Sequence, residues 1–121
     1  MKYLRLYADE NGGSHFEDMQ AAFDMAVYAP PAPAFGVSVA VEAKRYVMVH
    51  FPAGWDSGLH PVPRRQLFVM LSGRFQGQTS GGAVLDLGPG DVVLMEDTTG
   101  RGHSARTLDG TEVHALMVHL E

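Results

Sequence analysis

A polar stretch, "GWDSGLHPVPRRQ" (54–66), stands directly before the apolar run "LFVMLSG" (67–73). It brings a histidine, two arginines and a glutamine to the start of a segment with a strand pattern. Imidazole nitrogens bind divalent metals or exchange protons near neutral pH, and guanidinium groups bind carboxylates and phosphates. The stretch therefore fits three kinds of structure: a metal-binding hollow, an anion-binding rim or a polar loop.

Side-chain alternation predicts that some of these groups converge. Successive side chains of a strand point to opposite faces, so positions of equal parity share a side. One parity here holds His60, Val62, Arg64, Gln66, Phe68 and Met70. If the sheets enclose a hollow, His60, Gln66 and His103 can meet inside it, above a floor of apolar side chains. Apolar walls with a few polar groups are the usual lining of a small-molecule site.

Other side chains are candidates for the same hollow. Trp55, the single tryptophan, can cap its mouth or line it, and His50 ends the strand that leads into the polar stretch. The predicted pocket lining is thus Trp55, Arg64, Phe68, Met70 and His50. Roles for His15, His114 and His119 stay open, because an isolated histidine on an apolar face is usually a hydrogen-bonded structural residue.

The adjacent Arg64 and Arg65 could together hold an anion. The chain also has 14 acidic residues, which offer many partners for them. Surface ion pairs are common and contribute little, so we favour ordinary salt bridges for both arginines.

The elements that must position these residues are short strands. The 14 glycines and 7 prolines divide the chain into segments separated by turn signals such as "SGG", "GPGD" and "DG". Strand patterns occupy 3–8, 37–51, 67–73, 74–80, 82–87, 91–96, 103–108 and 111–120. Many short strands at this spacing predict an all-β protein, an antiparallel sandwich or barrel.

The N-terminal region has a different pattern. Ser14 and Glu17 have capping-box spacing, which favours a short helix over "FEDMQAAFDM". The following "APPAPAF" (29–35) suits neither a helix interior nor a central strand. We therefore expect one domain, with an N-terminal arm or flap over 1–36 and the barrel over 37–121.

Composition excludes several classes of protein. Charged residues make up 19% and hydrophobic residues 45%, as in globular rather than disordered chains. A net charge of -5 argues against a nucleic-acid partner, and without cysteine there are no disulfides or thiolates. No segment has the pattern of a signal peptide or a membrane span, so we expect a cytoplasmic protein that does not bind membranes.

The polar stretch also resembles a known motif. Gly54, five residues, His60, one residue, Val62, three residues, Gln66, six residues and Gly73 resemble the first signature of the cupin family. That signature has His-x-His and then a glutamate between its two glycines. Here both glycines and the first histidine are in place, whereas valine and glutamine replace the other two ligands.

The second cupin signature is similar to "GPGDVVLMEDTTGRGHSAR" (88–106). Gly90-Asp91 opens a strand, and a glycine-rich turn then leads to His103. Cupins usually carry proline at the position of Glu96 and a shorter turn. The resemblance implies a cupin-like jelly-roll β-barrel (a double-stranded β-helix), and it also implies a homodimer.

Cupins typically bind a divalent ion through three histidines and a glutamate. The resemblance implies His60, Gln66 and His103 as ligands of Zn, Fe, Ni or Mn, with His60 and His103 also catalytic. Because Val62 has no donor atom and Gln66 has no charge, such a site leaves positions open to water or substrate.

Two hypotheses for function follow. The first is a divalent-metal-assisted enzyme, an oxygenase, isomerase or cyclase, acting on a small organic molecule, either neutral or anionic. Without metal, His60 or His103 would act as general base while Gln66 orients the substrate. The second is a non-catalytic binding or sensing module with a degenerate metal site. The same architecture hosts both kinds of protein.

Overall fold

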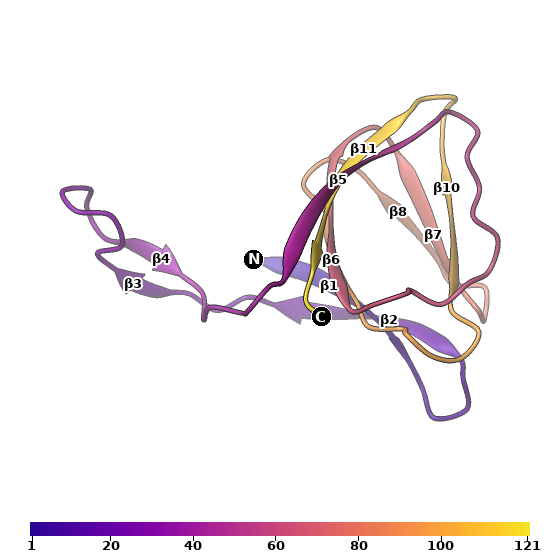
Figure 1. Ribbon diagram of the computed structural model, residues 1–121, viewed down its shortest axis with the longest axis horizontal. Helices are drawn as coiled ribbons and strands as arrows, with labels where there is room; N and C mark the ends of the chain where they lie inside the picture. The colour runs from indigo at the N-terminus through magenta and orange to yellow at the C-terminus, as the bar shows by residue number, and fades with distance from the viewer.

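The structure is a computed structural model of residues 1–121, and it consists of strands and loops (Figure 1). The strands are β1 (Lys2–Ala8), β2 (Ser14–Gln20), β3 (Asp24–Ala26), β4 (Phe35–Val37), β5 (Arg45–Phe51), β6 (Gln66–Ser72), β7 (Phe75–Thr79), β8 (Val84–Leu87), β9 (Val92–Met95), β10 (His103–Thr107) and β11 (Val113–His119). The all-β prediction is confirmed. No helix of membrane-crossing length and apolarity is present.

Two sheets form the body of the molecule. The larger has six strands in the order β2-β1-β9-β6-β11-β5, and the smaller has three in the order β10-β7-β8. Figure 1 shows the smaller sheet facing the larger one. All strand pairs in them are antiparallel except β1 with β9, which are parallel.

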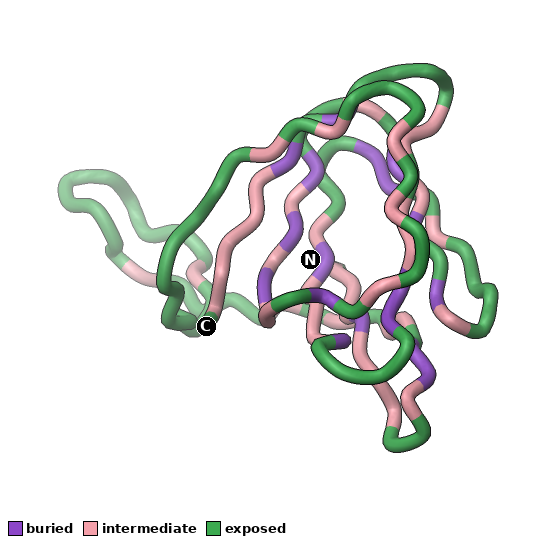
Figure 2. The backbone as a smooth tube through the Cα atoms, turned by 45° about the vertical axis from the view of Figure 1, so that its right-hand side comes forward, coloured by how far each residue is buried: buried purple, intermediate pink, exposed green.

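Alternation along the strands builds the core between these sheets. On β6, Gln66, Phe68 and Met70 are buried, whereas the intervening side chains are partly covered. The buried cluster consists of Leu6, Phe68, Met70, Phe75, Leu87, Val93, Val113 and Ala115, which come from both sheets. Figure 2 shows the buried residues on the strands of the body.

The segment between β5 and β6 joins the small sheet. Backbone bridges connect Asp56 and His60 of this segment with Arg106 and His103 of β10, respectively. The approach requires a glycine at position 102, which has a φ of +75°. A Cβ atom there would lie 2.0 Å from the carbonyl oxygen of His60. Gly102 thus lets the polar stretch lie directly beside β10.

The N-terminal region departs from the expected helix. Residues 14–20 form β2, which pairs with β1 along its whole length, so the helix prediction is wrong. Instead of capping a helix, the Ser14 hydroxyl donates to the carbonyl oxygen of Gly102 at 2.6 Å and accepts from the Ser80 amide at 2.9 Å. The partner strand and these distant contacts outweigh the local capping signal.

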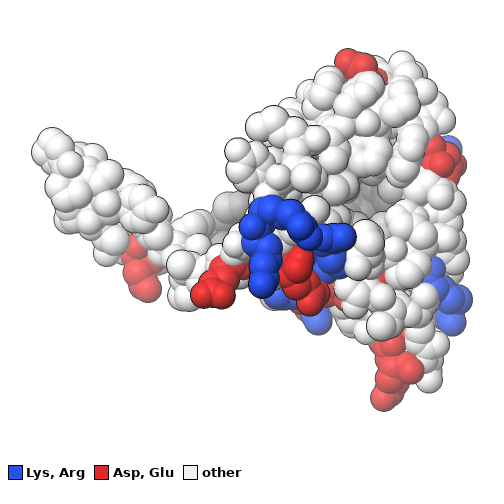
Figure 3. Space-filling view, viewed as in Figure 1, with Lys and Arg blue, Asp and Glu red and all other residues white.

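An arm, residues 21–44, projects from the body and contains the hairpin β3–β4 (Figure 1). The expected arm covered 1–36, but β1 and β2 lie within the large sheet. The projecting part therefore starts later and extends to the beginning of β5. Between 21 and 41 it has one charged residue, Asp24, and Figure 3 shows the arm as almost free of charged side chains.

Candidate functional site

A hollow of about 290 Å³ lies between the two sheets. Its walls are mainly apolar and include Leu6, Phe16, Phe51, Phe68, Phe75 and Leu87. Trp55 also lines it, with its ring centroid 4.7 Å from that of Phe51. Apolar walls limit the access of water to the few polar groups that reach the space, which strengthens electrostatic interactions among them.

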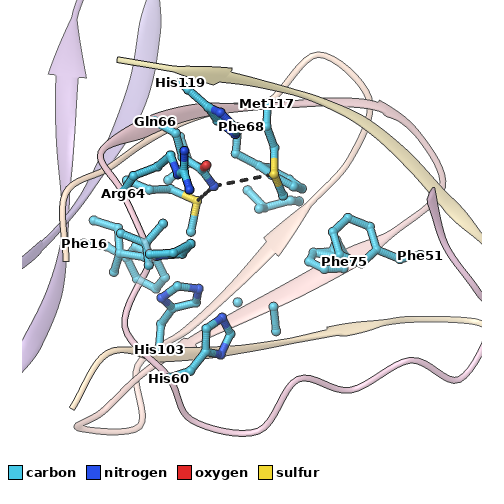
Figure 4. A pocket seen from close by; sticks show the side chains of 18 of the residues that line it. Phe16, Phe51, His60, Arg64, Gln66, Phe68, Phe75, His103, Met117 and His119 are labelled. Carbon is cyan, nitrogen blue, oxygen red and sulfur yellow. Dashed lines mark hydrogen bonds between the residues drawn. The ribbon is translucent and has the colours of Figure 1, made fainter. Parts of the chain in front are cut away.

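His60 and His103 lie together on one side of the hollow (Figure 4). Their ring centroids are 4.8 Å apart, and their backbones exchange hydrogen bonds of 2.8 and 2.9 Å. The main-chain bridge therefore sets the position of one ring against the other. The predicted meeting of these two imidazoles is present in the structure.

A buried carboxylate orients His103. Asp97 is completely buried, and its Oδ2 lies 2.6 Å from Nδ1 of His103. Because a carboxylate only accepts hydrogen bonds, the Nδ1–H donates, and in the neutral ring Nε2 is then the nitrogen with the lone pair. The second oxygen of Asp97, Oδ1, is buried without a partner.

The ring of His60 is fixed in the same way. Its Nδ1 lies 3.0 Å from the carbonyl oxygen of Gly58, which can only accept. Nε2 is again the free ring nitrogen. In the neutral form of each ring, the pair thus offers two nitrogens with lone pairs, one from each histidine.

A second polar group lies on another side of the hollow, as Figure 4 shows. Gln66 and His119 are opposed on β6 and β11, and Arg64 lines the hollow nearby. Burial, with help from the charges of Arg64 and Arg45, lowers the pKa of His119. Arg64 has no ion pair, so the salt bridge expected for it from the sequence is absent. The cation on this side of the hollow is therefore a free guanidinium.

The predicted metal ligands are not all brought together. Figure 4 shows Gln66 apart from His60 and His103, with its amide nitrogen 3.5 Å from the Met117 sulfur and 3.8 Å from the Met95 sulfur. The side of the hollow with His60 and His103 thus offers two nitrogen donors, whereas catalytic zinc sites usually have three protein ligands. This donor set fits a resident metal poorly.

The predicted pocket lining is partly present. Trp55, Arg64 and Phe68 line the hollow. Met70 is buried in the core and does not reach the space, and His50 is exposed outside it. On β5 the inward position next to His50 is Phe51, so alternation turns the histidine outward.

Comparison with known proteins bears on the fold. No protein-family model matches this chain, and no curated protein matches it. Solved structures do. A cupin domain from Bordetella pertussis has 16% identity and a TM-score of 0.51 over 85% of this chain and 97% of that one. The chain has the cupin fold.

Two further solved structures have similar folds. The cupin domain of Cnp3 from Schizosaccharomyces pombe is 13% identical, with a TM-score of 0.50 over 89% of this chain and 73% of that one. A predicted oxalate decarboxylase from Thermotoga maritima is 16% identical, with a TM-score of 0.51 over 98% and 93%.

Sequence reasoning missed two residues of this site. Asp97 was not singled out, although a carboxylate in the turn before His103 is a signal that could have indicated it. His119 was left without a role, although its parity with Met117 predicts an inward position, and both line the hollow. The remaining histidine of open role, His15, is exposed and lies 2.6 Å from the Asp9 carboxylate.

An ion-pair cluster holds the end of β9 immediately before Asp97. Glu96 accepts from Arg5 at 2.5 Å and from Arg65, so the predicted salt bridge of Arg65 is confirmed. Partial burial, the largest single effect, acts to raise the pKa of Glu96, but the hydrogen bonds from the two arginines together lower it. The ionised form of Glu96 is therefore favoured by folding.

This shift predicts a pH-dependent contribution to stability. A lowered carboxyl pKa stabilises the fold above the ordinary value of 4.5, and that contribution is lost as the pH falls through the folded-state value. Glu96→Gln should lower the free energy of unfolding by about 1 kcal/mol at pH 7. Thermal unfolding across pH 3 to 8 measures the difference, which should shrink toward zero below pH 4.5.

The control is Glu17→Gln, which removes only the exposed end of the same cluster, 3.0 Å from Arg5. If the free energy of unfolding of Glu96→Gln differs from that of the wild type by the same amount at pH 3 and at pH 7, ionised Glu96 does not stabilise the fold as assigned.

Proposed function

We propose that this cupin binds a small, mainly apolar organic anion in its hollow and transfers a proton through His103. The observation that carries the proposal is the 2.6 Å hydrogen bond between buried Asp97 and His103 at the wall of an apolar space. The volume of about 290 Å³ is at the small end for ligand pockets, which favours a small molecule.

His103 has the environment of a general base. Asp97 keeps the proton on Nδ1, so Nε2 can accept a proton from a bound molecule. When it does so, the imidazolium charge forms next to the buried carboxylate, which stabilises it without solvent reorganisation. His60, whose ring is adjacent, can act as the second acid or base.

The other side of the hollow suits the anionic part of the ligand. Arg64 is the cation without an ion pair there, and a guanidinium binds a carboxylate through two parallel hydrogen bonds. The lowered pKa of His119 favours the neutral form of its ring. Gln66 adds an amide that can orient the bound molecule.

A divalent-metal-assisted oxygenase, isomerase or cyclase is the second candidate. It is favoured by the two free Nε2 atoms of His60 and His103, whose Nδ1 atoms are both engaged. Only two protein ligands would hold the ion, so we rank this candidate below metal-free acid–base chemistry. A non-catalytic binding module is the outcome if the ligand binds and no proton is transferred.

The first experiment combines binding and exchange. We expect 4-methyl-2-oxopentanoate, a small apolar oxo acid, to quench the fluorescence of Trp55, the single tryptophan, and to exchange its C3 protons for deuterium in D2O. His103→Gln should reduce the exchange rate by about 10²- to 10⁴-fold while leaving the fluorescence titration unchanged. Arg64→Gln should weaken binding by about tenfold or more, because it removes a charged hydrogen-bond donor.

The matched controls are the neutral amide of the same oxo acid and Arg106→Gln, an exposed arginine outside this hollow. Equal binding of acid and amide would contradict the role of Arg64. Binding with no exchange for any of a panel of such oxo acids would contradict proton transfer. Full exchange that disappears with chelator would favour the metal-assisted candidate.

We infer also that the protein pairs with a second copy of itself through the arm. Its large apolar side chains are exposed, among them Met25 (72%), Tyr28 (70%) and Val39 (83%). The outer face of the large sheet leaves Met48 (77%) and Leu71 (51%) uncovered. In a two-fold dimer, the arm of each chain can cover the outer face of the large sheet of the other chain.

Sedimentation velocity measures this association directly. We expect the chain of 13.1 kDa to sediment as a dimer, and Val39→Asp to sediment as a monomer because the charge would be buried at the interface. Val84→Asp is the control, since Val84 is exposed on the small sheet. A wild-type monomer at tens of micromolar, or dissociation by both variants, would contradict this dimer.

A further inference from the structure

Two histidines and a glutamate meet on the outside of the large sheet. His50 on β5 and His114 on β11 are directly opposed in the antiparallel pair, and Glu112 immediately precedes β11. The two rings are stacked, with centroids 5.1 Å apart and an interplanar angle of 28°. Nε2 of His50 lies 2.8 Å from Oε2 of Glu112. All three side chains are exposed, and none lines the hollow.

Local backbone structure sets the position of His114. The register between β11 and β6 shifts between His114 and Ala115, so a β-bulge occurs at this point. Bulges change the direction of a side chain. Nδ1 of His114 lies 3.1 Å from the Ser72 hydroxyl, which holds the ring and leaves Nε2 as the free nitrogen. A hydrogen bond to the other ring nitrogen is what metal-binding histidines usually have.

We propose that His50, Glu112 and His114 form a binding site for a divalent transition metal, with Zn²⁺ as the best match. One ligand atom from each residue lies within 4.8 Å of the others. Metal–ligand bonds of about 2.0–2.2 Å put tetrahedral ligands about 3.3–3.6 Å apart, a change that exposed side chains reach by small rotations. Two imidazoles and a carboxylate suit zinc, with the fourth position left to water.

The site would have a structural consequence for the sheet. β5 is the edge strand of the six-stranded sheet, and it pairs only with β11. A metal held by His50 and His114 links these two strands near the end of β5, one residue pair before the terminal pair of Phe51 with Val113. Because the ion binds the folded chain, it should raise thermal stability as the metal concentration rises above the dissociation constant.

The test uses the full chain without a histidine tag, freed of metal by chelation. Isothermal titration with Zn²⁺ should show one equivalent bound at this site, and His50→Gln and His114→Gln should each weaken it by about ten- to a hundredfold. The melting temperature should rise with Zn²⁺ in the wild type and much less in these variants. Both substituted residues are exposed, so the variants should fold.

Two controls identify the site. His15→Gln removes an exposed histidine that also lies beside a carboxylate, and His60→Gln removes one from the hollow. Both should keep the zinc binding of the wild type. Absence of zinc binding, or loss of binding in His60→Gln with full binding in His50→Gln, would overturn the proposal. Neither result depends on the proposed proton transfer.

Discussion

A carboxylate shielded from water is costly to keep in a protein interior, and Asp97 is completely buried. One of its oxygens has a single partner, the ring of His103, and the other has none. Removing one member of a buried pair typically costs about 3–5 kcal/mol, because the other is left uncompensated. The ring of His103 is therefore constrained to face Asp97 with Nδ1, and Nε2 remains for the hollow. The chemistry proposed for this protein follows from that constraint.

The rest of the fold serves to bring distant segments to this pair. The carbonyl oxygen of Asp97 accepts from the Val62 amide at 3.1 Å, which ties the turn after β9 to the polar stretch. Gly102 permits the close backbone approach of His60 to β10. The Ser14 hydroxyl reaches the carbonyl oxygen of Gly102 from the start of β2. Two loops and the starts of β2 and β10 thus converge on one side of an otherwise apolar hollow.

Strand patterning and motif spacing predicted the architecture well, because they depend on local periodicity. The parity of β6 correctly placed Gln66 and Phe68 on the inner face, and the two motifs correctly brought His60 and His103 together. Local signals failed where distant partners decide the outcome. The capping-box spacing after Ser14 suggested a helix, but β1 offers that segment a full antiparallel partner.

The site was harder to predict than the fold, since it depends on which side of the hollow each inward residue reaches. Parity gives the face of a sheet but not the position across the space, so Gln66 was expected beside the histidines and lies apart from them. Asp97 matters because the turn after β9 brings its carboxylate against the ring of His103. The alternation of apolar and polar residues along strands does not predict the conformation of such a turn. His50 points outward because side chains alternate along β5. The sequence could have predicted this direction, since the large apolar Phe51 is expected to face inward and its neighbour to face outward.

The tautomer of His103 tests the central claim most directly. Long-range proton–nitrogen correlation NMR on the chain with ¹⁵N-labelled histidine distinguishes a protonated Nδ1 from a protonated Nε2 in each ring. The structure predicts that at neutral pH His103 carries its proton on Nδ1 and that Asp97→Asn abolishes this preference. A His103 ring with its proton on Nε2, or one with the averaged signals of a solvent-exposed imidazole, would contradict the account.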